Sequence, residues 1–119
     1  MSKVMVNCTH AKDDPERATL SFIAENVAAT ADQETKLLLT IDGVWLATKG
    51  YAPDVVQEGF PALQGILDSF VKNGGEIWAC SACTNPRGIT EADMIPGAKI
   101  VTAANVVEYM VSGASTLSF

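Results

Sequence analysis

Two cysteines, Cys80 and Cys83, stand three residues apart and are the side chains of this sequence best suited to chemistry. Cys80 ends an apolar run over residues 76–80, and polar residues follow Cys83. A thiol reacts as its thiolate, which a helix start or a nearby cation stabilises, and Arg87 lies seven residues beyond Cys80. Two sulfurs at this spacing approach each other on one turn, so the pair can hold a persulfide, a disulfide or a metal.

Other polar or reactive side chains are expected near this pair. Cys8 ends the first apolar run, His10 follows that run, and Asp42 follows the second run. The carboxyl ends of parallel strands meet at one edge of a sheet, where ligands bind, so we expect a supporting pocket of Arg87, Cys8, His10 and Asp42. Three of these residues also have a simpler interpretation. Cys8 acts as a small buried apolar residue, His10 suits a loop, and Asp42 suits a turn.

Several familiar sites do not fit the sequence. A thioredoxin-like motif begins a long helix, whereas Pro86 and Gly88 interrupt any helix here. A structural zinc site needs about four ligands, and the available set (Cys8, His10, Cys80 and Cys83) lacks finger or ribbon spacing. No Gly-rich phosphate loop, Ser-His-Asp order or His-x-x-x-His pair is present. We therefore expect no metal and no bound cofactor.

Alternating apolar runs and amphipathic segments must position these residues. The runs at 3–8, 36–41, 76–80 and 99–101 predict strands, and residues 115–119 predict a fifth. The runs show no clean alternation, which is typical of strands covered on both faces. Strand and helix in repeated alternation imply a mainly parallel sheet with helices on both faces, that is, an α/β fold.

Three helices are expected between the strands. Asp14 and Pro15 start the first, which ends near Ala31, and Thr102 caps the last. Pro61 opens the second, which Asn73, Gly74 and Gly75 close. The apolar stripes predicted to face the sheet are Leu20, Ile23, Ala24, Val27, Ala28 and Ala31; Leu63, Ile66, Leu67, Phe70 and Val71; and Ala103, Val106, Val107, Met110 and Val111.

Residues 44–60 are irregular, because Gly50, Pro53 and Gly59 interrupt them, and we interpret them as a surface excursion that includes a short helix at 44–48. Trp45 and Tyr51 in this segment are expected at a subunit interface. An assembly of identical chains is therefore one predicted partner.

Composition limits the class of protein. A chain of 119 residues suits one domain, 1–119, and its net charge of −6 disfavours nucleic acid and anionic lipid as partners. No apolar run approaches the roughly 18 residues of a membrane span, so we expect a soluble, cytoplasmic protein. Three cysteines cannot all pair, and a chain of this size does not need disulfides to fold, so their value is more chemical than structural.

The segment Cys-Ser-Ala-Cys-Thr-Asn-Pro-Arg-Gly-Ile at 80–89 resembles the DsrE/DsrF-like family of sulfur-handling proteins. The helix entry at 13–18, the turn at 42–44 and the glycine pair at 74–75 extend the resemblance over nearly the whole chain. The resemblance implies a three-layer α/β/α sandwich with about five strands, assembled as a trimer or hexamer. It also implies that Cys80, seven residues before Arg87 and Gly88, accepts sulfur as a persulfide, whereas Cys83 departs from the single-cysteine pattern of the relay subunits.

Three functions remain open at this stage. The first is a persulfide carrier or sulfurtransferase that works through Cys80, with a sulfur donor or acceptor protein as partner and Cys83 resolving the product as a disulfide. The second is a non-enzymatic homo-oligomeric binding module, with Trp45, Tyr51 and Phe60 at the subunit contacts. The third is a redox or metal sensor that uses the same cysteine pair.

Overall fold

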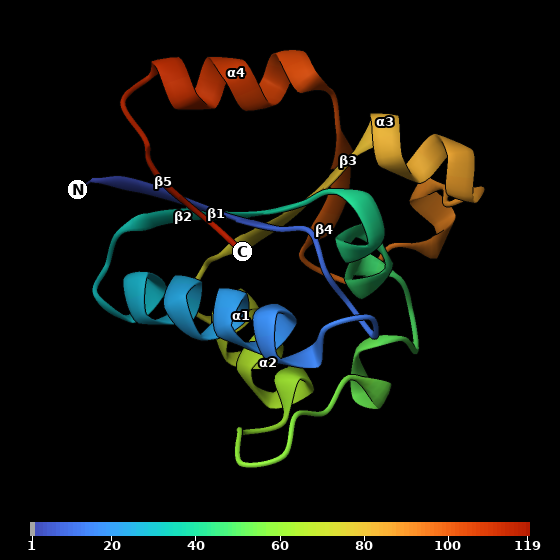
Figure 1. The fold of residues 1–119 in the computed structure, drawn as a ribbon. Helices are drawn as coiled ribbons and strands as arrows, with labels where there is room; N and C mark the ends of the chain where they lie inside the picture. The colour runs from blue at the N-terminus through green and yellow to red at the C-terminus, as the bar shows by residue number, and fades with distance from the viewer. Residues whose placement is uncertain (1) are drawn as a thin grey trace.

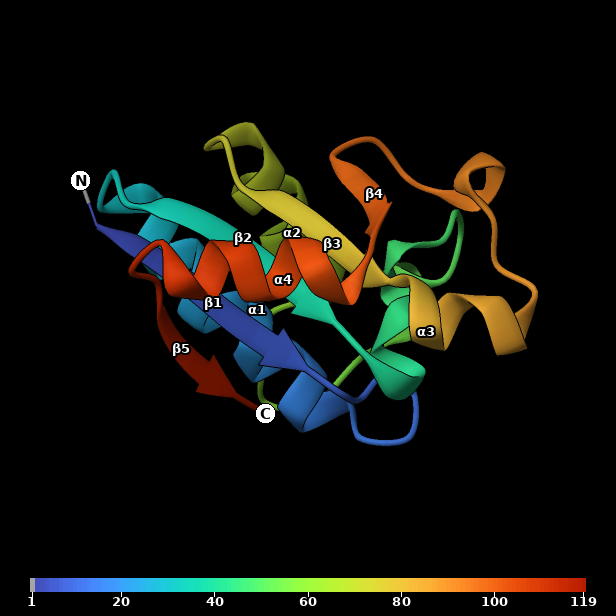
Figure 2. The ribbon, with the colours of Figure 1, turned by 90° about the horizontal axis from the view of Figure 1, so that it is seen from above.

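The computed structural model describes residues 2–119, which form a five-stranded parallel sheet in the order β4-β3-β2-β1-β5 (Figure 1). The strands are β1 (Lys3–Cys8), β2 (Glu34–Leu39), β3 (Glu76–Cys80), β4 (Ala98–Val101) and β5 (Ser115–Ser118). Helices α1 (Pro15–Thr30) and α2 (Leu63–Lys72) cover one face, and α4 (Ala103–Val111) crosses the other (Figures 1 and 2). The predicted three-layer α/β sandwich is confirmed.

The shorter elements lie beyond the carboxyl ends of the strands. They are η1 (Ile41–Ala47), η2 (Ala52–Asp54), α3 (Ser81–Thr84), η3 (Asn85–Arg87) and η4 (Glu91–Asp93). The short helix expected at residues 44–48 overlaps η1, which is a 3-10 helix that begins at Ile41 and ends at Ala47. Among residues 2–119, no helix combines the length and apolar character that a membrane span requires.

The predicted helix caps are confirmed, and two predicted boundaries are wrong. The Asp14 carboxylate accepts from the Arg17 N–H at 3.1 Å, and the Thr102 hydroxyl accepts from the Asn105 N–H at 3.3 Å. Helix α2 begins at Leu63 rather than at Pro61, because Ala62 is still extended with ψ 128°. Strand β2 covers residues 34–39 rather than 36–41, because the backbone turns out of the strand into η1.

The predicted apolar stripe of α1 does not face the sheet. Val27 is 64% exposed, and the other stripe residues are at most half-buried. The buried face instead consists of Ala18, Thr19, Ser21, Phe22, Glu25 and Ala29. Polar side chains occupy the buried face because each finds a partner there: the Ser21 hydroxyl donates to the Ala18 carbonyl, and the Glu25 carboxyl accepts from the Val6 N–H. The stripe of α2 is confirmed by buried Leu63, Leu67 and Phe70.

The predicted stripe of α4 is wrong except at Val106, which packs against the buried cluster on its side of the sheet. Val107, Met110 and Val111 are 56%, 45% and 81% exposed, and Tyr109 is the buried residue of this helix. The reason is that α4 crosses its face of the sheet without a neighbouring helix, so it touches the sheet along a narrow strip (Figure 2). A large ring fills that strip better than a row of small aliphatic side chains.

The two faces of the sheet therefore carry cores of different size. On the face covered by α1 and α2, hereafter the α1 face, a continuous cluster includes Phe22, Leu39, Phe70 and Ile77. On the α4 face, the buried cluster contains only Met5, Leu38, Trp78, Val101 and Tyr109. Successive strand residues alternate between these faces, so β3 sends Ile77 and Ala79 to the large core and Trp78 to the small one.

Candidate functional site

The loops that follow β1, β2 and β3 meet at the carboxyl edge of the sheet, as the parallel topology predicts. The Thr40 N–H donates to the Cys8 carbonyl at 3.1 Å and ties the end of β2 to the end of β1. Gly43 lies so close to this point that a Cβ there would overlap the Cys8 carbonyl oxygen. The Asp42-Gly43 pair lies in the predicted turn, where the Gly43 N–H donates to the Thr40 carbonyl at 3.0 Å; the turn opens η1, and its glycine permits close backbone approach.

Cys80 is the last residue of β3 and the N-cap of α3, with extended backbone angles of φ −70° and ψ 126°. Its thiol is partly exposed and unoxidised. Strand alternation places Cys80 on the same face as Trp78, which is the α4 face. Its neighbour across the ladder is Val101, the residue that leads into α4 through Thr102. Cys80 thus stands where β3, β4 and α4 meet.

Cys83 has a different environment, because it packs against the large core on the α1 face. The Ile41 N–H donates to the Cys83 sulfur at 3.1 Å. Ile41 holds φ at 55°, a left-handed conformation that a β-branched residue rarely adopts and that costs of order 1 to 3 kcal/mol. The strained residue is thus the one whose N–H donates to the Cys83 sulfur.

Arg87 and Asp42 connect η1 to the segment at 80–88, hereafter the cysteine turn, through hydrogen bonds. The guanidinium donates to Asp42 Oδ1 from Nε at 3.3 Å and from Nη2 at 2.9 Å, and Nη1 donates to the Cys83 carbonyl at 3.0 Å. The turn then ends at Gly88, whose φ of 69° favours glycine. We expected Arg87 to fold back toward the Cys80 sulfur; in the described part of the chain its hydrogen bonds go to these two oxygens.

Cys8 and His10 do not join the cysteine pair. Cys8 is fully buried in the large core, where its thiol donates to the His10 carbonyl at 3.1 Å, and burial raises the pKa of that thiol. His10 Nδ1 bonds Asp13 Oδ2 at 2.7 Å within the loop before α1. Within residues 2–119, no three His, Cys, Asp or Glu side chains gather as metal ligands do.

Trp45 and Tyr51, expected at a subunit interface, stack on each other with ring centroids 6.1 Å apart and pack against the large core. Trp45 also borders a cavity of about 410 Å³ that includes Arg87, Gly88 and Lys49.

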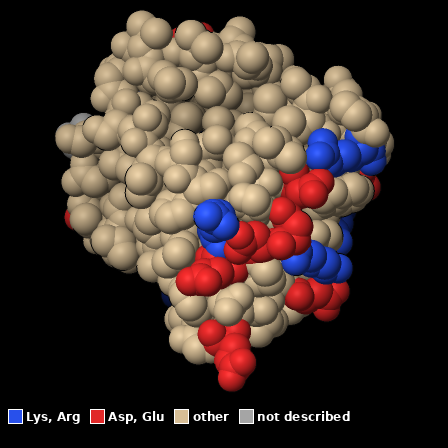
Figure 3. All heavy atoms as spheres, in the orientation of Figure 1, with Lys and Arg blue, Asp and Glu red and all other residues tan. Residues whose placement is uncertain are grey.

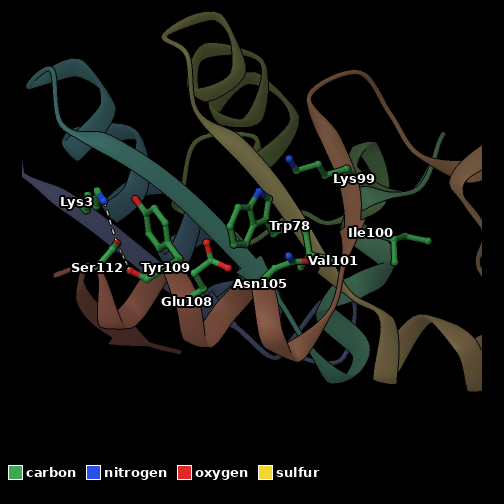
Figure 4. Close-up of a pocket in the computed structure, with 9 residues that line it drawn as sticks. All are labelled: Lys3, Trp78, Lys99, Ile100, Val101, Asn105, Glu108, Tyr109 and Ser112. Atoms are coloured by element: carbon green, nitrogen blue, oxygen red, sulfur yellow. Dashed lines mark hydrogen bonds between the residues drawn. The ribbon is translucent and has the colours of Figure 1, made fainter.

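A second cavity, of about 380 Å³, lies between α4 and strands β3 and β4 (Figure 4). Trp78 and Tyr109 form its floor, and Lys3 and Lys99 lie at its two ends. Sequence reasoning missed these residues, although the alternation of β3 contained the signal: Glu76, Trp78 and Cys80 share one face.

The fold and this edge define a class of protein: a parallel α/β sandwich with a partly exposed cysteine at the end of its third strand. The sequence profile of the DsrE/DsrF-like family matches residues 2–119. An uncharacterized protein of Methanopyrus kandleri is 31% identical over 104 residues, which cover 87% of this chain and 83% of that protein. The chain belongs to the DsrE/DsrF-like family.

Solved structures agree on the fold. The crystal structure of the ychN protein from E. coli matches with a TM-score of 0.81 and 23% identity, over the whole of both chains. A protein of unknown function from Methanobacterium thermoautotrophicum matches with a TM-score of 0.73 and 18% identity, also over the whole of both chains. At these identities the likeness concerns the arrangement of helices and strands alone.

Proposed function

We propose that this protein is a persulfide carrier or sulfurtransferase in which Cys80 accepts sulfur. The observation that carries the proposal is the position of Cys80, partly exposed at the end of β3 and outside both cores. The other two thiols have protein partners: Cys8 donates to a carbonyl, and Cys83 accepts from Ile41. Cys80 is the thiol free to meet a substrate.

The reaction balances without an added oxidant. The Cys80 thiolate attacks the outer sulfur of a donor persulfide, R–S–SH; the donor S–S bond breaks, R–S⁻ leaves, and Cys80–S–SH forms. An acceptor thiolate then attacks the same outer sulfur, takes it as its own persulfide and regenerates the Cys80 thiolate. The donor is a small persulfide or a persulfide on a partner protein, and the acceptor is a small thiol or a thiol of a partner protein.

Cys83 offers a second outcome for the same intermediate. Its thiolate attacks the inner sulfur of Cys80–S–SH, so that a Cys80–Cys83 disulfide forms and HS⁻ leaves. A thiol reductant must then restore the pair. The three-residue spacing of the two cysteines supports this role.

Intact-protein mass spectrometry after incubation with a persulfide donor tests the proposal. We expect an adduct of about 32 Da, one sulfur atom, in the wild type and in Cys8→Ala, and none in Cys80→Ser. In Cys83→Ser we expect the adduct to persist longer, because the resolving thiol is gone. An adduct that survives Cys80→Ser, or no adduct in any variant, would refute sulfur transfer through Cys80.

We also propose that the chain assembles with copies of itself. The exposed aliphatic side chains of α4 and Leu117 of the edge strand β5, which is 52% exposed, support the proposal. In Figure 3 the visible charged side chains gather at the lower right of the view, and the surface above, toward α4, is mostly uncharged. Burying such a surface in a symmetric contact removes apolar area from water.

A further inference from the structure

The cavity under α4 has the composition of a ligand site. Its floor consists of the rings of Trp78 and Tyr109, which meet edge to face with centroids 5.5 Å apart. Its wall on α4 carries Asn105, Glu108 and Ser112, which the helical spacing of three and four residues places on one side. Figure 4 shows Asn105 and Glu108 reaching from α4 toward Trp78. An aromatic floor with a few convergent polar groups is typical of small-molecule sites.

Charged groups of both signs surround this floor: three lysines, with the carboxylates of Glu76 and Glu108. Lys36 and Lys99 lie 5.5 and 5.6 Å from the Trp78 ring centroid, and Lys3 lies 5.7 Å from that of Tyr109. These are three of the eight Lys and Arg residues in a chain with a net charge of −6. The cavity lining itself holds Lys3, Lys99 and one carboxylate, Glu108. A ligand with both an anionic and a cationic group therefore finds a partner for each here.

The polar groups in and around the cavity differ in whether they already have a hydrogen-bond or ion-pair partner. Lys36 is hydrogen-bonded to Glu76, and Lys99 contacts the same carboxylate at 3.4 Å while keeping 55% of its side chain exposed. Glu108 makes no ion pair with any described residue. Asn105 uses its side-chain oxygen for Thr102, and its NH₂ group donates to no described residue. The cavity thus offers an ammonium and an amide donor for an anion, and a carboxylate for a cation.

The cavity also lies beside the proposed sulfur acceptor. Val101 belongs to its lining and is the ladder partner of Cys80. Trp78 precedes Cys80 by two residues on the same face, which corresponds to about 6 to 7 Å along a strand. A molecule held on the Trp78 floor therefore extends toward the Cys80 thiol with a single strand repeat to cross.

We propose that this cavity binds a small amino-acid-type thiol or its persulfide and presents the sulfur to Cys80. The ligand carboxylate binds Lys99 and the Asn105 amide, and its ammonium binds Glu108. The volume of about 380 Å³ suits an amino-acid or short-peptide thiol. This inference rests on the proposed function, because it names the substrate class of the same site; the donor reaction is the balanced transfer to Cys80 given above.

The first test measures binding without sulfur chemistry. The probe is S-methyl-L-cysteine, which cannot transfer sulfur, and the readout is Trp78 fluorescence in a Trp45→Phe background, or the Asn105 and Glu108 amide shifts in the wild type. We expect Lys99→Gln and Glu108→Gln each to weaken binding about threefold to fivefold, as for partly exposed ion pairs. Lys49→Gln, at the other cavity, should leave it unchanged. Equal binding by Lys99→Gln and wild type, or no binding, overturns the site.

The second test connects the cavity to Cys80. The rate of adduct formation from cysteine persulfide should saturate with concentration, and Lys99→Gln should raise the half-saturating concentration by the same factor. 2-Hydroxyethyl persulfide, which has the same reacting sulfur but neither the carboxylate nor the ammonium, should react equally with both proteins. A shift of equal size with this donor overturns the inference while leaving Cys80 chemistry intact. If no donor gives an adduct, the proposed function fails, and the fluorescence titration still decides whether the cavity binds the probe.

Discussion

The buried carboxyl of Glu25 makes stability depend on pH in a direction that can be worked out from the structure. Glu25 projects from α1 with no exposed surface; one oxygen accepts from the Val6 N–H at 2.9 Å, and the other has no partner among the described residues. Burial raises the pKa of Glu25 from 4.5 to about 8. The folded protein therefore keeps a proton on this carboxyl at pH values where the unfolded chain has lost it.

The magnitude follows from proton linkage. Between pH 4.5 and about 8 the folded state binds one more proton than the unfolded state, so the free energy of unfolding falls as pH rises. Each pH unit in this window is worth about 1.4 kcal/mol, which gives a total of about 5 kcal/mol as an order of magnitude. The contribution is fully present below pH 4.5 and is lost by about pH 8. Because a domain of this size has only about 5 to 15 kcal/mol of stability, the effect is large.

Urea unfolding at pH 5, 7 and 9, followed by circular dichroism, measures this slope. Glu25→Gln keeps the acceptor for Val6 and cannot ionise, so its stability should match that of the wild type within about 1 kcal/mol at pH 5 and exceed it by several kcal/mol at pH 9. Glu16→Gln, on the exposed first turn of the same helix, serves as the matched control and should follow the wild type. Parallel wild-type and Glu25→Gln profiles across this range would refute the reasoning.

Two further predictions concern the cysteine turn and the α4 surface. Arg87→Ala removes the hydrogen bonds to Asp42 and to the Cys83 carbonyl. In a Cys80→Ser background, Cys83 should then react several-fold faster with a disulfide reagent, while the free energy of unfolding changes by less than about 1 kcal/mol. An unchanged rate would show that these Arg87 hydrogen bonds do not shield the Cys83 thiol. Val111→Asp on α4 should lower the mass measured by light scattering, whereas Val56→Asp, on an exposed loop, should not; equal masses would place the subunit contact elsewhere.

Local sequence signals predicted the strands and the helix caps, because these features depend on neighbouring residues in the chain more than on tertiary packing. β3 was predicted at its observed bounds, since polar residues follow its apolar run, and Asp14 and Thr102 have the side-chain oxygens that helix starts require. The helix faces were harder. Polar and apolar residues are spread around the circumference of α1, so periodicity alone chose the Leu20 to Val27 stripe, although tertiary packing buries Phe22 and Glu25.

The candidate site was predicted in part for a related reason. The convergence of three strand ends follows from parallel topology, and it correctly brought Asp42 and Arg87 together. It could not separate the faces: Cys8 and Cys80 both end strands at the same edge, yet Cys8 lies in the large core and Cys80 belongs to the α4 face. The position of a residue along its strand determines which edge of the sheet it lies at. Its parity, that is, whether it is an odd or an even residue of the strand, determines which face it lies on, so both are needed to assign its neighbours.

Parity also explains why a reactive residue can be tolerated at the end of β3. The α1 face is covered by two helices and holds the large core, whereas the α4 face is covered by one helix and has a cavity beside Trp78. Moving the cysteine by one residue, to position 79, would bury its thiol in the large core, as Cys8 is buried, and burial raises a thiol pKa. The function proposed for Cys80 therefore depends on the uneven covering of the two faces as much as on the residues that surround its sulfur.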